Sequence, residues 1–208
     1  MKLTEERIKR FESVISNRQY DLTIILENVH DPHNIGAVLR TCDSIGIREI
    51  FVIYTDPRLM ERGIEIGHKS SSGANHWIDI NYFEDVHECM KHVKLNYHRI
   101  IGTSLTDESA SLYEVDFSTS CAILFGNEHS GISEEALPYI DIPMLIPQHG
   151  FVKSLNISVA CAVTLYECQR QRLKQGRYSR PFGEDARDEA MFRDYENKHW
   201  VKKFNRDD

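Results

Sequence analysis

Short apolar, strand-like runs alternate along the chain with longer helical stretches. The apolar runs predict strands at Leu22–Glu27, Glu49–Ile53, Trp77–Ile80, Arg99–Thr103, Cys121–Phe125 and Ile140–Met144. The stretches between them predict helices at roughly Asn34–Ile45, Phe83–Lys94, Glu134–Leu137 and Leu155–Lys174. Strands and helices in this alternation are typical of an α/β fold, in which a mostly parallel sheet carries helices on both faces.

Both ends of the chain extend this core. A polar amphipathic helix is expected near Thr4–Arg18, and a second helix at Asp185–Lys203. In the second helix, apolar side chains line one face that can dock on a neighbour; they are Met191, Phe192, Tyr195 and Trp200. Disorder is the alternative, because this tail is highly charged. We divide the chain into a helical extension (residues 1–20), a core domain (21–178) and a C-terminal extension (179–208).

Ligands of parallel α/β sheets collect beyond the carboxyl ends of the strands. Three loops of the predicted sheet qualify: residues 28–36, 103–108 and 126–133. They follow the first, fourth and fifth predicted strands, so a binding site is expected where they meet.

The composition favours a single globular domain without a membrane span or a signal peptide. The chain has 208 residues, of which 41% are hydrophobic, enough to bury one domain core. No apolar stretch approaches the roughly 20 residues of a membrane span, and the start of the chain lacks the apolar core of a signal peptide. We therefore expect a soluble, cytoplasmic protein.

Cysteine and histidine spacing gives no sign of a disulfide framework or a metal site. Five cysteines lack CxxC spacing, and we expect buried, reduced thiols; they are Cys42, Cys89, Cys121, Cys161 and Cys168. His30 and His33 lie three residues apart, but no second closely spaced ligand pair completes a zinc site. We expect no metal.

The net charge of −7 conceals two basic segments. Residues 21–165 hold nine Lys and Arg against twenty Asp and Glu, whereas residues 166–180 hold five basic residues against one acidic residue. The five are Arg170, Arg172, Lys174, Arg177 and Arg180, and the first helix adds Arg7, Lys9, Arg10 and Arg18. Two basic elements on an acidic body suit a localised contact with phosphates. A solvated helix end that complements its own dipole is the alternative.

Three motifs carry candidate chemistry. In the first, Pro32 sets a turn, Asn34 is placed to cap the next helix and Gly36 permits close packing. Arg40 follows within that helix, and a phosphate is its expected partner. An ion pair between Arg40 and Glu128 or another carboxylate remains the alternative.

The second motif is a glycine-bracketed loop after the fifth predicted strand. Gly126 and Gly131 enclose Asn127 and Glu128, so that backbone N–H groups can lie flat against a ligand. A turn without any ligand is the alternative. Neither a GxGxxG nor a GxxxxGK[ST] pattern occurs, which argues against dinucleotide and P-loop sites.

The third motif runs from Pro143 to Arg172. Lys153, Ser154 and Asn156 bring a cation, a hydroxyl and an amide to a helix start, where backbone N–H groups favour negative charge. Small residues then keep the helix slim enough for close backbone packing; they are Ser158, Ala160, Cys161, Ala162 and Thr164.

Together the three motifs resemble the SpoU (TrmH) family of RNA ribose 2′-O-methyltransferases, within the SPOUT class. The family patterns N-x-x-A-x-x-R-T, F-G-x-E-x-x-G-[IV]-[ST] and I-P-M…S-L-N-[VI]-S-V-A match Asn34–Thr41, Phe125–Ser133 and Ile142–Ala160. The similarity runs from about residue 10 to residue 178. Flanking pieces such as RQYDLT and YECQRQRLKQG resemble the branch that methylates guanosine 18 in the D-loop of tRNA.

The resemblance implies a Rossmann-like sheet whose C-terminal third forms a deep trefoil knot, and it implies a homodimer. It also implies that S-adenosylmethionine binds in the knot. The residues expected to hold it are Thr103, Ser104, Leu105, Gly126, Asn127, Glu128, Leu145, Ile146 and Leu155.

Catalytic and RNA-binding roles carry over in the same way. The expected catalytic residues are Arg40, Asn34, Glu128, Ser154 and Asn156. Arg40 would act either as the base for the ribose 2′-hydroxyl or as an electrostatic clamp, which fits a guanidinium better because a guanidinium stays protonated in proteins. The expected RNA contacts are Arg10, Arg18, His33, Arg40, Lys153, Arg170, Arg172 and Lys174.

One segment departs from the family pattern. The stretch LIPQHG, residues 145–150, makes the link between Met144 and Ser154 several residues longer than in relatives, where the adenine of the cofactor should be enclosed. His129 and Ser130 also stand where relatives often have a lysine or an aromatic residue.

The sequence hypothesis is therefore an S-adenosylmethionine-dependent methyltransferase for the ribose of tRNA guanosine 18. Ribosomal RNA or another tRNA position is the alternative substrate. An RNA-binding protein that retains the fold without activity is the alternative of another class.

Overall fold

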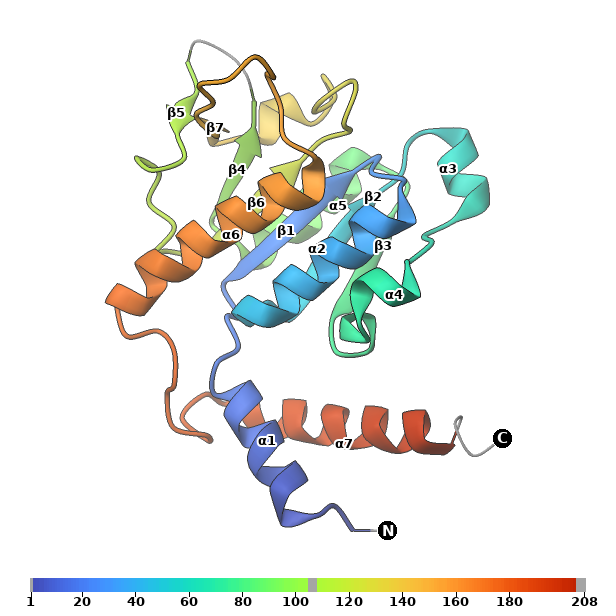
Figure 1. Ribbon diagram of the computed structural model, residues 1–208, viewed down its shortest axis with the longest axis vertical. Helices are drawn as coiled ribbons and strands as arrows, with labels where there is room; N and C mark the ends of the chain where they lie inside the picture. The colour runs from blue at the N-terminus through green and yellow to red at the C-terminus, as the bar shows by residue number, and fades with distance from the viewer. Residues whose placement is uncertain (1, 105–107, 205–208) are drawn as a thin grey trace.

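A seven-stranded sheet forms the centre of the computed structural model, which describes residues 2–104 and 108–204 (Figure 1). The strand order is β3-β2-β1-β6-β4-β7-β5, and every pairing between these strands is parallel. The strands are β1 (Leu22–Glu27), β2 (Glu49–Ile53), β3 (Asp79–Phe83), β4 (Arg99–Thr103), β5 (Ala110–Ser111), β6 (Cys121–Phe125) and β7 (Ile142–Leu145). The predicted mostly parallel α/β fold is confirmed.

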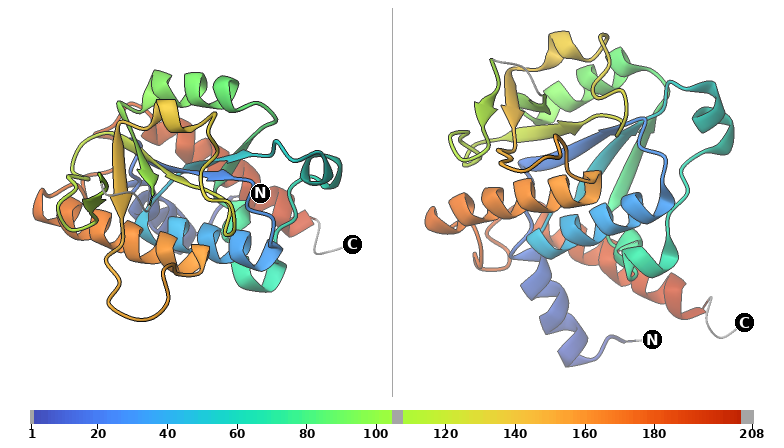
Figure 2. Two further views of the ribbon diagram at one scale, coloured as in Figure 1. Left: turned by 90° about the horizontal axis from the view of Figure 1, so that it is seen from above. Right: turned by 45° about the horizontal axis from the view of Figure 1, so that its top comes forward.

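Helices cover both faces of the sheet. They are α1 (Glu5–Ile15), α2 (Pro32–Ile45), α3 (Pro57–Arg62), α4 (His68–Ser71), α5 (Val86–Asn96), α6 (Ile157–Lys174) and α7 (Asp188–Phe204), with 3₁₀ turns η1 (Ala74–His76) and η2 (Leu137–Tyr139). Helices α2 and α6 lie side by side on one face, and α5 covers the other (Figure 2). Each face has its own apolar core.

Chain order places a topological switch point in the middle of the sheet. From β1 the chain moves outward to β2 and β3, whereas β6, the neighbour of β1 on its other side, belongs to the second half. The loops that follow β1 and β6 therefore leave the sheet next to each other, where ligands bind in open α/β sheets. The first and second motifs, which follow β1 and β6, therefore lie at this edge of the sheet.

The sequence predicted the central elements better than the connections. Strands β1, β2, β4 and β6 have the predicted bounds, but β3 begins two residues later than predicted and β7 is Ile142–Leu145. The predicted helix Glu134–Leu137 is wrong, because this stretch is a series of turns that leads into η2. Short elements α3, α4, η1 and β5 were not predicted, since each is too short to show a period.

The two terminal helices pack on each other, away from the motif-bearing edge of the sheet (Figure 1). Phe11 of α1 contacts Trp77, Phe192 and Tyr195 edge to face, with ring centroids 5.7–5.9 Å apart. Ion pairs of Arg48 and Lys198 with Asp194 and Asp79 join α7 to the sheet. Both terminal segments thus contain the expected helices, and the apolar face of α7 docks within the same chain.

Two arginines expected to contact RNA are instead buried. Arg18 is 3% exposed and donates to the Tyr195 hydroxyl, the Ile47 carbonyl and the Asp43 carboxylate. Arg172 is fully buried and uses all of its guanidinium nitrogens. Its acceptors are the carbonyls of Phe117, Thr119 and Asp21 and the side chains of Gln19 and Asp21.

Arg172 therefore holds the junction between the N-terminal extension, the start of β1 and α6. Burial alone would raise the pKa of Asp21, but the nearby Arg172 and Arg177 guanidiniums hold it below its usual range. The RNA-binding role predicted for Arg18 and Arg172 is wrong, because protein groups occupy both side chains. All five cysteines are buried free thiols, as expected.

Within the described residues, no helix is both long and apolar enough to cross a membrane.

Replacing Arg172 with alanine should destabilise the fold. The change leaves the Asp21 carboxylate without its buried partner, and such losses cost about 3–5 kcal/mol of unfolding free energy. Urea unfolding measures this, with Lys174→Ala as the matched control on the same helix. Lys174 is exposed at the end of α6, so its loss should change stability by less than about 1 kcal/mol. Equal effects of the two substitutions would contradict the structural role of Arg172.

Candidate functional site

The first motif begins with a capped helix. Asp31 caps α2, since its carboxylate accepts the backbone N–H of His33 at 2.8 Å, and Pro32 takes the first helical position. Asn34 therefore lies inside the first turn, and the prediction that it caps the helix is wrong. Because the Asp31 carboxylate already accepts a backbone N–H at the start of α2, the Asn34 amide remains available for contacts with other segments.

The second motif forms a tight turn after β6. Asn127 and Gly131 exchange backbone hydrogen bonds of 3.0 and 2.9 Å, and Glu128 lies exposed within the turn. A Cβ atom added to Gly126 would lie 2.2 Å from the carbonyl carbon of Gly131. The turn can fold back this closely only because residue 126 has no side chain.

The third motif brings Asn156 to the start of α6. Its side-chain oxygen caps the helix, accepting the backbone N–H of Ser158 at 2.9 Å and the Ser158 hydroxyl at 2.6 Å. Its amide nitrogen remains free to donate, and it does so to the side-chain oxygen of Asn34 at 3.1 Å. Asn156 is thus both a helix cap and a link to the first motif.

A chain of side-chain hydrogen bonds joins the three motifs. Asn34 accepts from Asn156 and donates through its own amide nitrogen to a carboxylate oxygen of Glu128 at 3.0 Å. The order is therefore Ser158, Asn156, Asn34, Glu128. Each amide donates at one end and accepts at the other, so the chain fixes the orientation of every member. Three of the predicted catalytic residues meet here.

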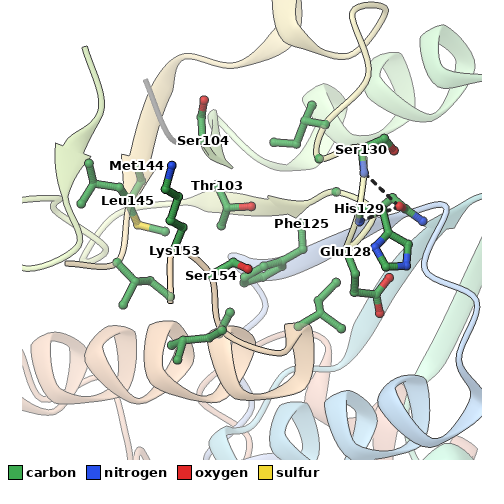
Figure 3. A pocket seen from close by; sticks show the side chains of 18 of the residues that line it. Thr103, Ser104, Phe125, Glu128, His129, Ser130, Met144, Leu145, Lys153 and Ser154 are labelled. Atoms are coloured by element: carbon green, nitrogen blue, oxygen red, sulfur yellow. Dashed lines mark hydrogen bonds between the residues drawn. The ribbon is translucent and has the colours of Figure 1, made fainter. Parts of the chain in front are cut away.

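A cavity of about 560 Å³ lies beside this chain, within the size range of small-ligand sites. Eight of the nine residues expected to hold the cofactor line it; they are Thr103, Ser104, Gly126, Asn127, Glu128, Leu145, Ile146 and Leu155. The ninth, Leu105, lies outside the described residues. Ser154 and Lys153 also line it. Figure 3 shows Leu145 and Lys153 at one end and Glu128 with His129 at the other, with Thr103, Phe125 and Ser154 between them.

Several lining residues were not predicted. They are Phe125, His129, Ser130, Gly131, Ile132, Leu137, Met144, Ile157 and Ala160. Gln148 also lines the cavity, within the segment 145–150 that was expected to enclose the adenine. Most of the unpredicted residues are next to a predicted motif residue in the sequence, so the motifs could have indicated them. Leu137 could not have been found in this way, because it belongs to η2, which the sequence did not predict.

The long link between β7 and α6 borders the cavity. Gln148 lines it and donates to the Lys153 carbonyl at 3.4 Å, which closes this loop on itself. Phe151 and Val152 at the tip of the loop are exposed. The segment that departs from the family pattern therefore forms one wall of the cavity and an apolar tip beside it.

Arg40 lies outside the hydrogen-bonded chain. It is exposed on α2, on the same helix face as His33, seven residues earlier. Among the described residues, no hydrogen bond or ion pair involves the Arg40 side chain, so the alternative of an Arg40–Glu128 ion pair is wrong. An exposed guanidinium with free donors can bind a phosphate in a bidentate way.

The remaining predicted RNA contacts are exposed. Arg10 lies on α1 and Lys174 at the end of α6. Arg170 pairs with Glu167 at 2.6 Å, yet half of its side chain faces solvent. With His33, Arg40 and Lys153, these residues form a discontinuous set of accessible basic and histidine side chains.

Cys89 and Cys121 are poor nucleophiles. Burial raises the pKa of Cys89 to about 12 and that of Cys121 to about 11, so both thiols are protonated near neutral pH. Among residues 2–104 and 108–204, no three His, Cys, Asp or Glu side chains gather closely enough to share a metal ion.

Comparison with known proteins gives consistent matches. The model of the SpoU rRNA Methylase family matches residues 21–166. The tRNA (guanosine(18)-2'-O)-methyltransferase of Thermus thermophilus is 43% identical over 178 residues, which cover 86% of this chain and 89% of that protein.

Solved structures of RNA-modifying enzymes are also similar to this chain. The crystal structure of the A. aeolicus TrmH/SpoU tRNA modifying enzyme has a TM-score of 0.82 and 31% identity, covering 93% of this chain and 97% of that chain. The AdoMet bound rRNA methyltransferase from Sinorhizobium meliloti has a TM-score of 0.62 and 25% identity, covering 74% and 57%.

Gly126→Ala should disrupt the turn of the second motif. The new methyl group would overlap the backbone of Gly131 and Ile132, so the turn must open at a cost of about 1–3 kcal/mol in unfolding free energy. Gly150→Ala is the control, because a Cβ there meets nothing within 4 Å; its effect should stay within about 0.5 kcal/mol. Urea unfolding compares the two, and equal stability would show that the turn does not need the close approach.

Proposed function

This chain belongs to the SpoU rRNA Methylase family, and from that premise we propose that it transfers a methyl group from S-adenosylmethionine to a ribose 2′-hydroxyl of tRNA. The observation that carries the proposal is the hydrogen-bonded chain from Asn156 through Asn34 to Glu128, beside a cavity of about 560 Å³. Such a chain holds polar groups in fixed orientations next to a ligand, as group transfer requires.

Guanosine 18 is the proposed target nucleotide. The Thermus thermophilus relative carries this activity in its name, and the match spans 86% of this chain. The accessible basic residues at the two ends of the chain support a contact with a structured RNA. Such a substrate also makes the cytoplasm the proposed site of action.

The cavity fits the proposed cofactor. Apolar side chains such as Met144, Leu145 and Leu155 suit an adenine ring, while the glycine turn brings backbone groups close to a ligand. Loop residues Thr103, Ser104, Gly126 and Ile146 would complete the enclosure. The bound cofactor would supply a methyl group made electrophilic by a neighbouring sulfonium charge.

The residues of this chain would orient and stabilise the reacting ribose. We assign Arg40 the role of an electrostatic clamp, since its free guanidinium can hold an RNA phosphate and stabilise negative charge on the 2′-oxygen. Glu128, Asn34 and Asn156 would fix the geometry opposite the methyl group, and Ser154 would contribute a hydroxyl. A clamp demands no deprotonated arginine. As the methyl group leaves, the sulfonium would become a neutral thioether, and the 2′-hydroxyl proton would pass to water.

We also propose a homodimer and a knotted C-terminal third. Exposed apolar residues along α6 support the dimer; they are Val159, Tyr166 and Leu173, which are 46–55% exposed. A second copy packed on α6 would remove this surface from water. Helix α6 packs beside α2 and carries small residues such as Ala160 and Ala162, which is compatible with a threaded chain.

Methyl transfer to defined RNAs tests the function. With radiolabelled S-adenosylmethionine, the protein should label a tRNA transcript at the 2′-oxygen of guanosine 18, and replacing that nucleotide with a 2′-deoxy analogue should abolish the label. Absence of label on any RNA would overturn the enzyme assignment. Label on ribosomal RNA alone would overturn only the substrate.

Arg40→Lys should lose most activity. Lysine keeps the charge but lacks the planar fork of arginine, and we expect a fall in kcat/KM of about 100-fold. Cofactor affinity measured by calorimetry should remain unchanged. Arg58→Lys, on an exposed arginine of α3, serves as the control and should keep wild-type activity. Near wild-type activity of Arg40→Lys would rule out a bidentate clamp.

A further inference from the structure

Asn28 has an unusual backbone conformation directly after β1. Its φ angle is +53°, in the left-handed region that only a few non-glycine residues adopt, asparagine among the more tolerant. Asn28 does not line the cavity, and none of the three motif patterns includes it. Contacts with neighbouring groups are therefore needed to hold the Asn28 backbone in this conformation.

Contacts with the end of β2 hold Asn28 in place. Its side-chain oxygen accepts the backbone N–H of Thr55 at 2.9 Å, and its amide nitrogen donates to the Thr55 hydroxyl at 2.9 Å. Its own N–H donates to the Ile53 carbonyl at 2.8 Å. The residue is therefore fixed to the neighbouring strand by both its backbone and its side chain.

The carbonyl of Asn28 faces the glycine turn. It accepts the side-chain amide of Asn127 at 2.8 Å. The side-chain oxygen of Asn127 in turn accepts the backbone N–H groups of His129 and Ser130, at 2.9 and 3.2 Å. Asn127 thus anchors both sides of Glu128 within the turn and ties the turn to the end of β1.

We propose that Asn28 is a positioning residue that acts through Asn127 to hold Glu128 beside Asn34. The structural path runs from the fixed Asn28 carbonyl to Asn127, then through the turn to Glu128 and its hydrogen bond with Asn34. This assignment rests on the proposed function, because it concerns the same Glu128.

Asn28→Ala tests the proposal. Alanine removes the anchors to Thr55 and disfavours the left-handed conformation, so the carbonyl should turn away from Asn127. We expect the single-turnover rate at saturating cofactor to fall about 10-fold to 100-fold. Asn28→Asp should recover most of the rate, because aspartate keeps the acceptor for Thr55 and tolerates the same backbone conformation.

Two controls separate positioning from general loss of stability. Ser72→Ala alters another left-handed residue, with φ +50°, on a different loop, and should leave the rate unchanged. In a Glu128→Gln background, Asn28→Ala should cause little further loss, because the group it positions is already altered. Full additivity of the two losses would overturn the proposal.

Amide hydrogen exchange gives a readout that does not require activity. Asn28→Ala should speed exchange within residues 126–133, while Ser72→Ala should not. If the wild-type protein methylates no RNA but the exchange changes as expected, the proposed function fails and the anchoring of the turn by Asn28 stands. If Asn28→Ala alters neither the exchange nor the rate, the positioning role is overturned.

Discussion

The arrangement of this site depends on one chain of side-chain hydrogen bonds, from Ser158 through Asn156 and Asn34 to Glu128. It joins segments that are 94 and 122 residues apart in sequence, and it does so near the exposed edge of the sheet, where water competes for each bond. An isolated bond there contributes little. The chain persists because each participating segment is fixed independently: α2 by its Asp31 cap, α6 by its buried side chains Cys161, Leu165 and Cys168, and the turn by Gly126 and Asn127.

The parallel sheet explains why these three segments meet. Strands β1 and β6 are neighbours at the switch point, so the loops after them leave the sheet together. Helix α6 packs beside α2 on one face, which brings the start of α6 to the same edge. The cavity is the space left between these loops and the link from β7 to α6. Folding of the core and assembly of the site are therefore coupled, since each loop is positioned by an element whose other end is buried.

Local patterns in the sequence predicted most of the architecture and much of the site. Apolar runs identified β1, β2, β4 and β6, and motif spacing identified Asn34, Glu128 and Asn156. Burial of charged residues could not be predicted in the same way: Arg172 follows a basic pattern typical of a solvated helix end, yet its acceptors come from Gln19, Asp21 and the loop after β5. The role of Asn28 was likewise invisible, because it depends on φ and on a carbonyl that no pattern describes.

If Asn34 and Asn156 act as one unit that orients the site, a double-mutant cycle on the single-turnover rate should show their coupling. Asn156→Ser keeps a helix cap for α6 but removes the amide that donates to Asn34, and Asn34→Ala removes the other half of the contact. We expect the double variant to be no slower than the slower single variant. Rate losses that simply multiply would rule out a shared unit, because they would mean that the two residues act independently.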